Sequence, residues 1–428
     1  TRDPLTRLAD IGHVRSTMAR WQLEWRGTEY ACPMHLMLIS LGRIETVNVA
    51  FGETAGDGAL VEVAQRIRHF AADELESGVW QAARVSGGSF LLAAREECSR
   101  ERWQWLGEAL ADAIATPISS PDMGASVRLS PRLVLLRATE GDTPDAMLDH
   151  LAEGLRRLVK VPGKRLAWTS GELAQSGLTH HQLEADLLSA IDSDEIQILF
   201  QPQYSCGEDR LVGAEALARW QHPQLGRVGA GTLFTIAERA DHVAQLSRHV
   251  AKRALEAAAR WREGLRLSIN VTPADLAAGS FARDFLALVA QAGVSPESLT
   301  LEITEQVLLA ELERVSEVLS TIREAGISLA LDDFGAGFCN FHYLKILPID
   351  AIKLDHSMVE GIVEEPRDLA VFRAIVAMAR ALDLKVVAEG IENEAQLEIV
   401  TREGCATYQG FLRSEPVTSE EFARLSAE

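Results

Sequence analysis

The stretch ISLALDDFGAG, residues 327–337, combines the apolar pattern of a buried strand with two adjacent carboxylates, Asp332 and Asp333. Two glycines follow, with one alanine between them. Aspartate and glycine are common turn residues, so this stretch taken alone predicts a strand that ends in a turn. Whether the two carboxylates also do chemistry depends on where comparable side chains fall elsewhere in the chain.

Apolar runs of similar length recur through the second part of the chain and alternate with segments of helical periodicity. About eight such runs over roughly 250 residues are typical of a (β/α)8 barrel, so we predict a TIM-like barrel of the α/β class. The predicted strands are IQILF, ending at residue 200, and then 211–217, 265–271, 299–304, 327–333, 351–355, 385–391 and 407–411. The main predicted helices are 233–262, 306–324, 359–382 and 394–402.

The first part of the chain has a different, α+β pattern built around an antiparallel hairpin. The predicted elements are a hairpin at 78–94, helices at 56–70, 99–116 and 145–159, and strands at 35–41 and 126–137. Proline, glycine and weak periodicity mark a boundary at 160–178. We therefore predict an α+β domain at 1–170, a linker at 171–181 and the barrel domain at 182–428.

Charge and cysteine content narrow the classes of partner. The chain has a formal charge of −20, so it repels nucleic acids and anionic membranes at long range, and we expect no nucleic-acid polymer as partner. Five scattered cysteines without C-x-x-C spacing predict free thiols and no zinc site. No apolar run reaches the length of a membrane span, which predicts a cytoplasmic protein. The opening residues TRDPLT read like an internal stretch, which leaves open an upstream sensor or membrane segment.

One polar side chain ends or interrupts nearly every predicted strand of the barrel domain. Functional residues of such barrels gather where strands end, because the loops there line the open mouth. Buried carboxylates are costly unless they are paired or bind metal. Carboxylate and amide oxygens suit Mg²⁺ or Mn²⁺, and one aspartate can bridge two ions, as a two-metal site for phosphodiester hydrolysis requires. The side chains concerned are Glu215, Asn270, Glu302, Asp332, Asp333, Lys353, Glu389 and Gln409.

Seven motifs, in this order, resemble the signature set of EAL domains, the cyclic di-GMP phosphodiesterases. They are EALAR (215–219), NVT (270–272), LEITE (301–305), DDFGAGF (332–338), KLD (353–355), AEGIE (388–392) and YQGF (408–411). The resemblance covers residues 182–418 and implies an enzyme that hydrolyses cyclic di-GMP to linear 5'-pGpG with two divalent ions, Mg²⁺ or Mn²⁺. It also implies a homodimer formed through this domain.

The resemblance gives each matching position a role. The ligands of the first metal match Glu215, Asn270, Glu302 and Asp332, and those of the second match Asp332, Asp333 and Glu389. Lys353 matches a lysine that orients the hydrolytic water. Glu389 is also a candidate general base, directly or through a metal-bound water. Gln409 matches a residue that holds water or metal near the scissile phosphate. We predict that Asp332 bridges both ions, whereas Asp333 turns with the chain and binds only the second.

Other matching positions concern the substrate and a loop. Gln201 and Arg219 match residues that contact the nucleotide. Asp333 and Glu392 are also predicted to bind the substrate, and the role of Glu392 is the least defined. Glu305 matches a glutamate that steadies the loop 335–343. That loop reads AGFCNFHYL where relatives have a TGYSSLSYL-like stretch, and it couples dimerisation to metal binding in the family. We therefore expect the unusual loop sequence to affect the rate and regulation of hydrolysis more than the chemical mechanism.

The first domain resembles diguanylate cyclases of the GGDEF family, on the hairpin RVSGGSF (84–90) and the opening DPLTRLA (3–9). Gly88 and Ser89 replace the two acids of that signature, and Ser40 stands where the family has a metal aspartate. Without these carboxylates nothing holds Mg²⁺ against a triphosphate, so we expect cyclase activity to be lost and the domain to be regulatory or structural. Asn48 and Asp57 match guanine-contacting positions, which leaves open GTP as a regulator beside a simple remnant of ancestry.

Two alternatives remain beside the phosphodiesterase. A non-catalytic cyclic di-GMP receptor would usually have lost several ligands, whereas here none is lost. A bifunctional cyclase and hydrolase is disfavoured by the missing acids at positions 40, 88 and 89.

Overall fold

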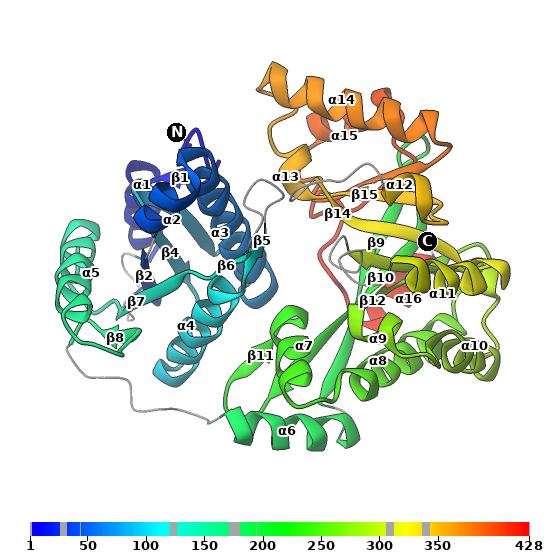
Figure 1. Cartoon of the computed structure of the whole chain (residues 1–428), viewed down its shortest axis with the longest axis horizontal. Helices are drawn as coiled ribbons and strands as arrows, with labels where there is room; N and C mark the ends of the chain where they lie inside the picture. Colours follow the sequence, from blue (N-terminus) through cyan, green and yellow to red (C-terminus); the bar gives the residue numbers. More distant parts are fainter. Residues whose placement is uncertain are drawn as a thin grey trace. The chain divides into compact units, whose positions relative to one another are not determined.

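The computed structural model describes residues 2–25, 32–42, 44–119, 126–170, 180–193, 195–304, 312–335 and 343–427. The chain forms two compact units, coloured along the sequence in Figure 1. The first unit is Thr1–Leu183 with Gln221–Thr232, and the second is Glu184–Trp220 with Leu233–Glu428. Most of the predicted linker lies outside the described residues.

The first unit is an α+β fold around a six-stranded sheet with the order β1-β3-β4-β2-β7-β8. Its strands are β1 (Ala9–Asp10), β2 (Met34–Gly42), β3 (Trp80–Ser86), β4 (Ser89–Arg95), β7 (Ser130–Arg137) and β8 (Leu166–Trp168), beside the short pair β5 (Ile118–Ser119) and β6 (Ser126–Val127). Its helices are α1 (Ile11–Glu24), α2 (Ile44–Phe51), α3 (Glu53–Glu74), α4 (Arg100–Ala115) and α5 (Pro144–Val159). The side chains of Asp10, Ser99 and Thr143 accept backbone hydrogen bonds at the starts of α1, α4 and α5.

The predicted hairpin is confirmed, because β3 and β4 pair antiparallel and turn at Gly87, whose φ is +53°. A φ in the left-handed region suits glycine. Strand β2 lies in the middle of the sheet and is buried along nearly its whole length, which explains its unbroken apolar run.

The segment Gln221–Thr232 belongs to the first unit although it is distant in sequence. The Arg102 guanidinium donates to the carbonyls of Leu225 and Arg227 at 2.9 and 2.6 Å. The Gly229 N–H donates to the buried Glu74 carboxylate at 3.0 Å. Burial raises the pKa of Glu74 to about 7, aided by Asp73, while hydrogen bonds from Thr232 and Gly229 and the charge of Arg102 lower it.

The second unit is a closed barrel. Strands β9 (Ile196–Ser205), β10 (Leu211–His222), β12 (Arg266–Val271), β13 (Leu299–Thr304), β14 (Ser328–Phe334), β15 (Ala351–Leu354), β16 (Lys385–Ala388) and β17 (Thr407–Tyr408) form it in order, and β9 pairs with β10 to close it. The short β11 (Gly226–Val228), in the segment Gln221–Thr232, is the neighbour of β10 in the strand order. Its first strand differs from an all-parallel (β/α)8 barrel, because β9 runs antiparallel to both β10 and β17. A turn of five residues from β9 to β10 is too short for a parallel crossover.

Helices follow most of the barrel strands, as the alternation predicts (Figure 1). Helix α6 (His180–Asp192) precedes β9. The elements after it are α7 (Ala230–Arg239), α8 (Val243–Ala258), α9 (Pro273–Ala277), α10 (Phe281–Ala292), the 3-10 turn η1 (Pro296–Ser298), α11 (Leu312–Glu324), α12 (Tyr343–Ile346), α13 (His356–Val359), α14 (Pro366–Ala381), α15 (Glu394–Glu403) and α16 (Ser419–Ala427). The predicted helix 233–262 is divided into α7 and α8, and the predicted helix 359–382 begins late, at Pro366 of α14. The break between α7 and α8 contains Asp241 with a φ of +59°, and Pro366 begins α14 after α13 has ended.

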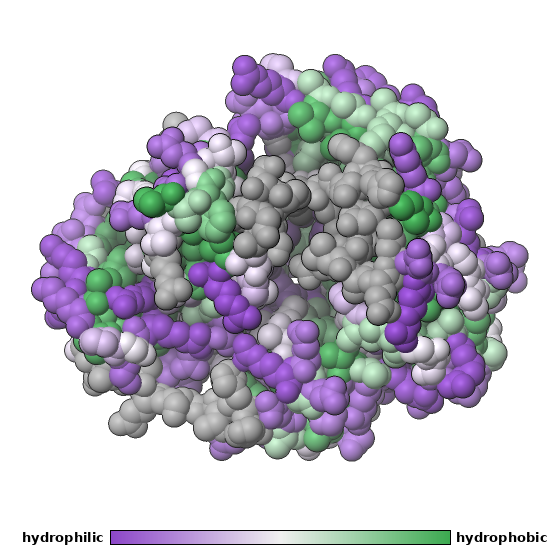
Figure 2. All heavy atoms as spheres, viewed as in Figure 1, coloured by the Kyte–Doolittle hydropathy of each residue, from purple (hydrophilic) through white to green (hydrophobic). Residues whose placement is uncertain are grey.

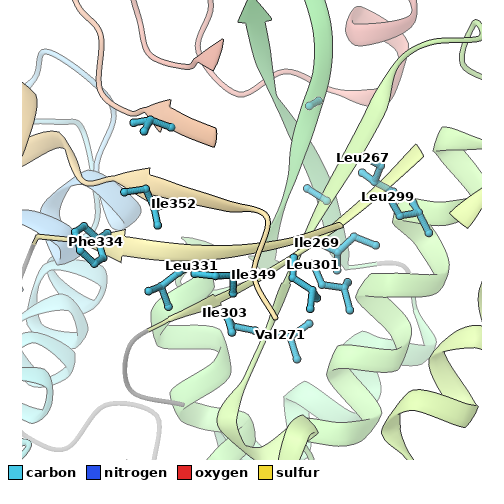
Figure 3. Packing of buried hydrophobic residues seen from close by; sticks show 14 of the residues in the cluster. Leu267, Ile269, Val271, Leu299, Leu301, Ile303, Leu331, Phe334, Ile349 and Ile352 are labelled. Carbon is cyan, nitrogen blue, oxygen red and sulfur yellow. The ribbon is translucent and has the colours of Figure 1, made fainter. Parts of the chain in front are cut away.

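Alternate side chains of the barrel strands pack outward against the helices. Leu267, Ile269 and Val271 of β12 lie beside Leu301 and Ile303 of β13 in one apolar cluster (Figure 3). Because side chains alternate across a strand, the residues between them face the barrel interior. The core thus explains why polar residues at intervening positions, such as Asn270 and Glu302, face inward.

The described residues include the free thiols that the sequence predicts and a surface with many hydrophilic side chains. The face drawn in Figure 2 carries many hydrophilic side chains, with smaller hydrophobic areas among them. Free thiols are found at Cys32, Cys98, Cys206 and Cys405, and Cys339 lies outside the described residues. None of the described helices is long and apolar enough to cross a bilayer.

Candidate active site

Four acidic side chains of the barrel converge on one lysine. The Lys353 ammonium, from β15, lies 3.1 Å from Glu215, 2.6 Å from Glu302, 3.1 Å from Asp332 and 2.7 Å from Glu389. The Lys353 side chain is only 1% exposed. An ammonium at the centre of four carboxylates partly neutralises a group of charges that would otherwise repel one another.

The register of the parallel strands brings these residues to one level. Asn270 of β12 lies opposite Glu302 of β13, and Thr304 of β13 lies opposite Asp332 of β14. Glu215 comes from β10, next to β12, and Glu389 follows β16 directly. The carboxyl ends of neighbouring parallel strands meet at the same edge of a barrel, so these side chains share its mouth.

The two adjacent aspartates are separated by a change in the backbone. Asp333 has a φ of +55°, and the pairing of β14 with β15 shifts register between Leu331 and Phe334. This irregularity interrupts the strict alternation of a strand, so both side chains can face the same site.

Two groups of acidic oxygen atoms result, each lying within 4.8 Å of one another. Glu215, Glu302 and Asp332 form one group, and Asp332, Asp333 and Glu389 form the other. Of these two groups, both contain Asp332, and the second contains Asp333.

Burial and mutual repulsion raise the pKa of several carboxyls. Burial is the largest cause at Glu302, Asp332 and Glu389, and neighbouring carboxylates add to it. Burial also disfavours the charge on Glu215, yet Lys353, Gln409 and Asn270 together hold the pKa of that carboxyl below its usual value. For Lys353, the four carboxylates outweigh burial and keep its pKa well above the ordinary value.

Amide side chains complete the cluster. Asn270 Nδ2 donates to Glu215 Oε1 at 2.7 Å. Gln409 Nε2 donates to Glu215 Oε2 at 2.8 Å and to Glu389 Oε1 at 2.9 Å. Gln203 Nε2 in turn donates to Gln409 Oε1 at 2.9 Å. Sequence reasoning missed Gln203, although the stretch FQPQ contains it two residues beyond Gln201, on the same face of the strand.

Comparison with models of protein families shows which family this barrel belongs to. The family model of the EAL domain matches residues 184–416, more than half of the chain. The chain belongs to the EAL domain family. A second family model, of the diguanylate cyclase GGDEF domain, matches residues 1–161.

Relatives of this EAL protein include curated sequences of greater length. One is the cyclic di-GMP phosphodiesterase NbdA of Pseudomonas aeruginosa, 31% identical over 401 residues that cover 91% of this chain and 50% of NbdA. Another is an uncharacterized protein of Mycobacterium tuberculosis, 32% identical over 395 residues that cover 91% of this chain and 62% of the relative. The chain thus spans only part of these relatives.

Solved structures show the same barrel. The PaMucR phosphodiesterase in complex with c-di-GMP is 31% identical, with a TM-score of 0.54, and the match covers 56% of this chain and 99% of that one. The S helix-GGDEF-EAL structure of Vibrio cholerae LapD covers 96% of this chain and 95% of that one at a TM-score of 0.55. At 18% identity, the LapD match concerns the fold alone.

The remaining predicted site residues of the EAL unit differ in burial and in their hydrogen bonds. Gln201 is buried, and its amide donates to the carbonyl of Ser414 at 2.9 Å. Arg219 is also buried and donates to the carbonyl of Ala218 at 2.8 Å. Glu392 is exposed, and its N–H donates to Gln396 at the start of α15. Glu305 and residues 336–342 of the predicted loop lie outside the described residues.

The GGDEF-like unit places its substituted positions together. Ser40 of β2 lies opposite Ser89 of β4, and the Leu41 N–H donates to the carbonyl of Gly88. Ser40, Gly88 and Ser89 therefore offer no carboxylate here. Asn48 and Asp57 lie within helices α2 and α3, and both are exposed.

Proposed function

We propose that this protein is a metal-dependent phosphodiesterase that hydrolyses cyclic di-GMP to 5'-pGpG. The observation that carries the proposal is the pair of carboxylate groups sharing Asp332, at the mouth of a barrel of the EAL family. The names of NbdA and of the PaMucR complex support cyclic di-GMP as the substrate. The first unit, on this proposal, has no cyclase activity and is regulatory or structural.

The donor set fits two hard divalent cations. The described cluster offers carboxylate and amide oxygens, which are ligands that Mg²⁺ and Mn²⁺ prefer. One ammonium faces four carboxylates, so ionisation of all four leaves an excess of negative charge that a further cation would balance. Glu215, Asn270, Glu302 and Asp332 would hold one ion, and Asp332, Asp333 and Glu389 the other. Bound ions would polarise the phosphodiester and favour deprotonation of the attacking water.

The protein's own groups would hold the substrate and move one proton. The Arg219 guanidinium suits a phosphate of the dinucleotide. Glu389 would accept the proton of the attacking water. Lys353 would favour negative charge on the attacking oxygen. The water oxygen forms a new P–O bond as the bond from phosphorus to the 3' oxygen breaks, and that oxygen takes up a proton.

Chromatographic analysis of cyclic di-GMP incubated with the purified chain tests the proposal. With Mg²⁺ or Mn²⁺ the product should be 5'-pGpG, and chelation with EDTA should stop its formation. Binding of cyclic di-GMP without turnover would overturn the proposal and favour a receptor.

A parallel incubation with GTP tests the role proposed for the first unit. We expect no cyclic di-GMP to form from GTP, because the acids needed for a cyclase metal site are missing at positions 40, 88 and 89. Formation of cyclic di-GMP would contradict the loss of cyclase activity. A change in the rate of hydrolysis on addition of GTP would assign a regulatory nucleotide site to this unit.

We also propose that the protein forms a homodimer through the EAL unit, on the basis of the family resemblance. Light scattering coupled to gel filtration measures the molar mass directly. A mass of about one chain at micromolar concentration would contradict this part of the proposal.

A further inference from the structure

We infer that Gln203 is a positioning residue that acts through Gln409 on the two carboxylates Glu215 and Glu389. The inference rests on the proposed function and adds a residue to the proposed site. Within the described part of the chain, the Gln203 amide donates to Gln409 and not to the carboxylates, so its action depends on the amide of Gln409.

Gln203 lies on the strand that closes the barrel. It stands on β9, opposite Gly213 of β10, and the end of β9 also pairs with β17, which Gln409 follows directly. The Gln203 side chain reaches from β9 to Gln409, 206 positions away in sequence, and is buried with 8% exposure. The antiparallel direction of β9 thus brings this amide beside the catalytic mouth.

The amide of Gln409 has two N–H donors and one carbonyl oxygen. Both donors are used on carboxylates, one on Glu215 and one on Glu389. The carbonyl oxygen accepts from Gln203. With the amide reversed, this oxygen would face two ionised carboxylates, which only accept hydrogen bonds, and the NH2 group would face the donor of Gln203. In a buried cluster, unsatisfied polar groups are costly, so Gln203 favours the orientation observed.

The main chain of Gln409 is fixed independently of its side chain. Its N–H donates to the carbonyl of Ala388 at 2.9 Å, and its carbonyl accepts from the N–H of Ile391 at 3.1 Å. A Cβ on the next residue, Gly410, would lie 2.3 Å from the backbone of Ile391, so the segment is closely packed. What remains to be set is the orientation of the side-chain amide, and Gln203 sets it.

The orientation matters because Gln409 connects the two carboxylate groups. Glu215 belongs to the group formed with Glu302, and Glu389 belongs to the group formed with Asp333. Gln409 donates to one member of each and so helps to fix their separation. Residues that orient metal ligands from a second layer typically alter metal affinity or activity by about 10- to 100-fold when replaced.

Two variants of Gln203 separate hydrogen bonding from packing. Gln203→Leu keeps a similar volume and removes the donor, while Gln203→Glu keeps the shape and replaces the donor by an acceptor. Because Gln291 is exposed at the far end of α10, Gln291→Leu and Gln291→Glu are matched controls. The measurements are kcat and KM for cyclic di-GMP with excess Mn²⁺, and calorimetric titration with Mn²⁺ alone.

We expect Gln203→Leu to lower kcat roughly tenfold and to weaken Mn²⁺ binding by a similar factor, with little change in KM. Gln203→Glu should lower both further, because it favours the reversed amide. The two Gln291 variants should behave like the wild type. Wild-type kcat and Mn²⁺ affinity in both Gln203 variants would overturn the inference. If Gln203→Leu does not fold, Gln203→Glu decides the test by the same criteria.

A double-mutant cycle tests the path through Gln409. The variant carrying both Gln203→Leu and Gln409→Leu should be no slower than Gln409→Leu alone, because Gln203 has nothing left to orient. Multiplication of the two single effects would contradict an action through Gln409. Absence of turnover in the wild type would defeat the proposed function but not this inference, because the Mn²⁺ titrations of the same variants still test Gln203.

Discussion

Replacing Lys353 by methionine removes the charge that four buried carboxylates share. Methionine keeps the unbranched apolar stem, so the change in packing is small and the loss of the ammonium dominates. We expect the metal-free variant to be markedly less stable than the wild type, and divalent cations to restore much of the difference.

The contact distances give the magnitude. The ammonium lies between 2.6 and 3.1 Å from one oxygen of each carboxylate. At an effective dielectric constant of about 20, each such pair attracts by about 5–6 kcal/mol before any desolvation is counted. Burial of the ammonium cancels much of this sum. Removing one partner of a buried ion pair costs about 3–5 kcal/mol, because the remaining charges stay uncompensated.

Thermal unfolding followed by circular dichroism measures this effect. With EDTA at neutral pH, a loss of about 3–5 kcal/mol should lower the melting temperature by roughly 6–20 °C for a unit of this size. Addition of Mg²⁺ should raise the melting temperature of the variant more than that of the wild type, because a cation replaces the missing charge. Lys252→Met is the matched control, since Lys252 is 62% exposed and 3.8 Å from Glu256. An exposed pair of this kind contributes at most about 1 kcal/mol.

Two results would refute the reasoning. If Lys353→Met melted together with Lys252→Met in EDTA, the lysine would not be the stabilising counter-charge of the cluster. If Mg²⁺ stabilised the variant and the wild type equally, the cation would not be compensating for the lost ammonium.

Three further predictions concern turnover, metal binding and pH. Glu215→Ala should abolish hydrolysis and weaken binding of Mn²⁺, measured by calorimetry; wild-type values would remove Glu215 from the proposed ligands. Lys353→Ala should lower kcat for cyclic di-GMP more than it weakens binding of the nucleotide, and the reverse pattern would contradict its role at the attacking oxygen. Burial raises the pKa of Glu74 to about 7. The folded state therefore binds the proton more tightly than the unfolded chain, and this carboxyl destabilises the fold as pH rises from about 4.5 to 7, by on the order of 3 kcal/mol above that range. Glu74→Gln should remove that loss, so urea unfolding at pH 8 should show a larger gain in stability than unfolding at pH 5; equal effects at the two pH values would contradict the raised pKa.

The sequence predicts the location of the acidic cluster better than its internal contacts. Strand periodicity and the position of one polar residue at each strand end place Glu215, Glu302 and Asp332 at one edge of a barrel, because neighbouring parallel strands present their carboxyl ends together. The resemblance to EAL domains adds the prediction that Lys353 orients a water. The structure shows its ammonium in ion pairs with four carboxylates, because closure of the barrel carries β15 into the middle of the group.

The backbone at the two aspartates is a second feature that the sequence predicts only in part. A regular strand would send Asp332 and Asp333 to opposite faces, and sequence alone predicts only that this alternation relaxes near the glycines. The positive φ of Asp333 and the shifted pairing with β15 depend on the neighbouring strand, and they bring both carboxylates to one site.

By itself, the sequence determined the α+β and barrel architectures, the family and the candidate ligands of the proposed metal site. Each depends on local periodicity or on short motifs that are contiguous in the chain. Only the tertiary structure decided the antiparallel direction of β9 and the hydrogen bond from Gln203 to Gln409. These two residues are separated by 206 positions, and they meet because the last strand of the barrel pairs with the first. Local patterns carry no signal for such a contact, since it arises from ring closure of the whole sheet.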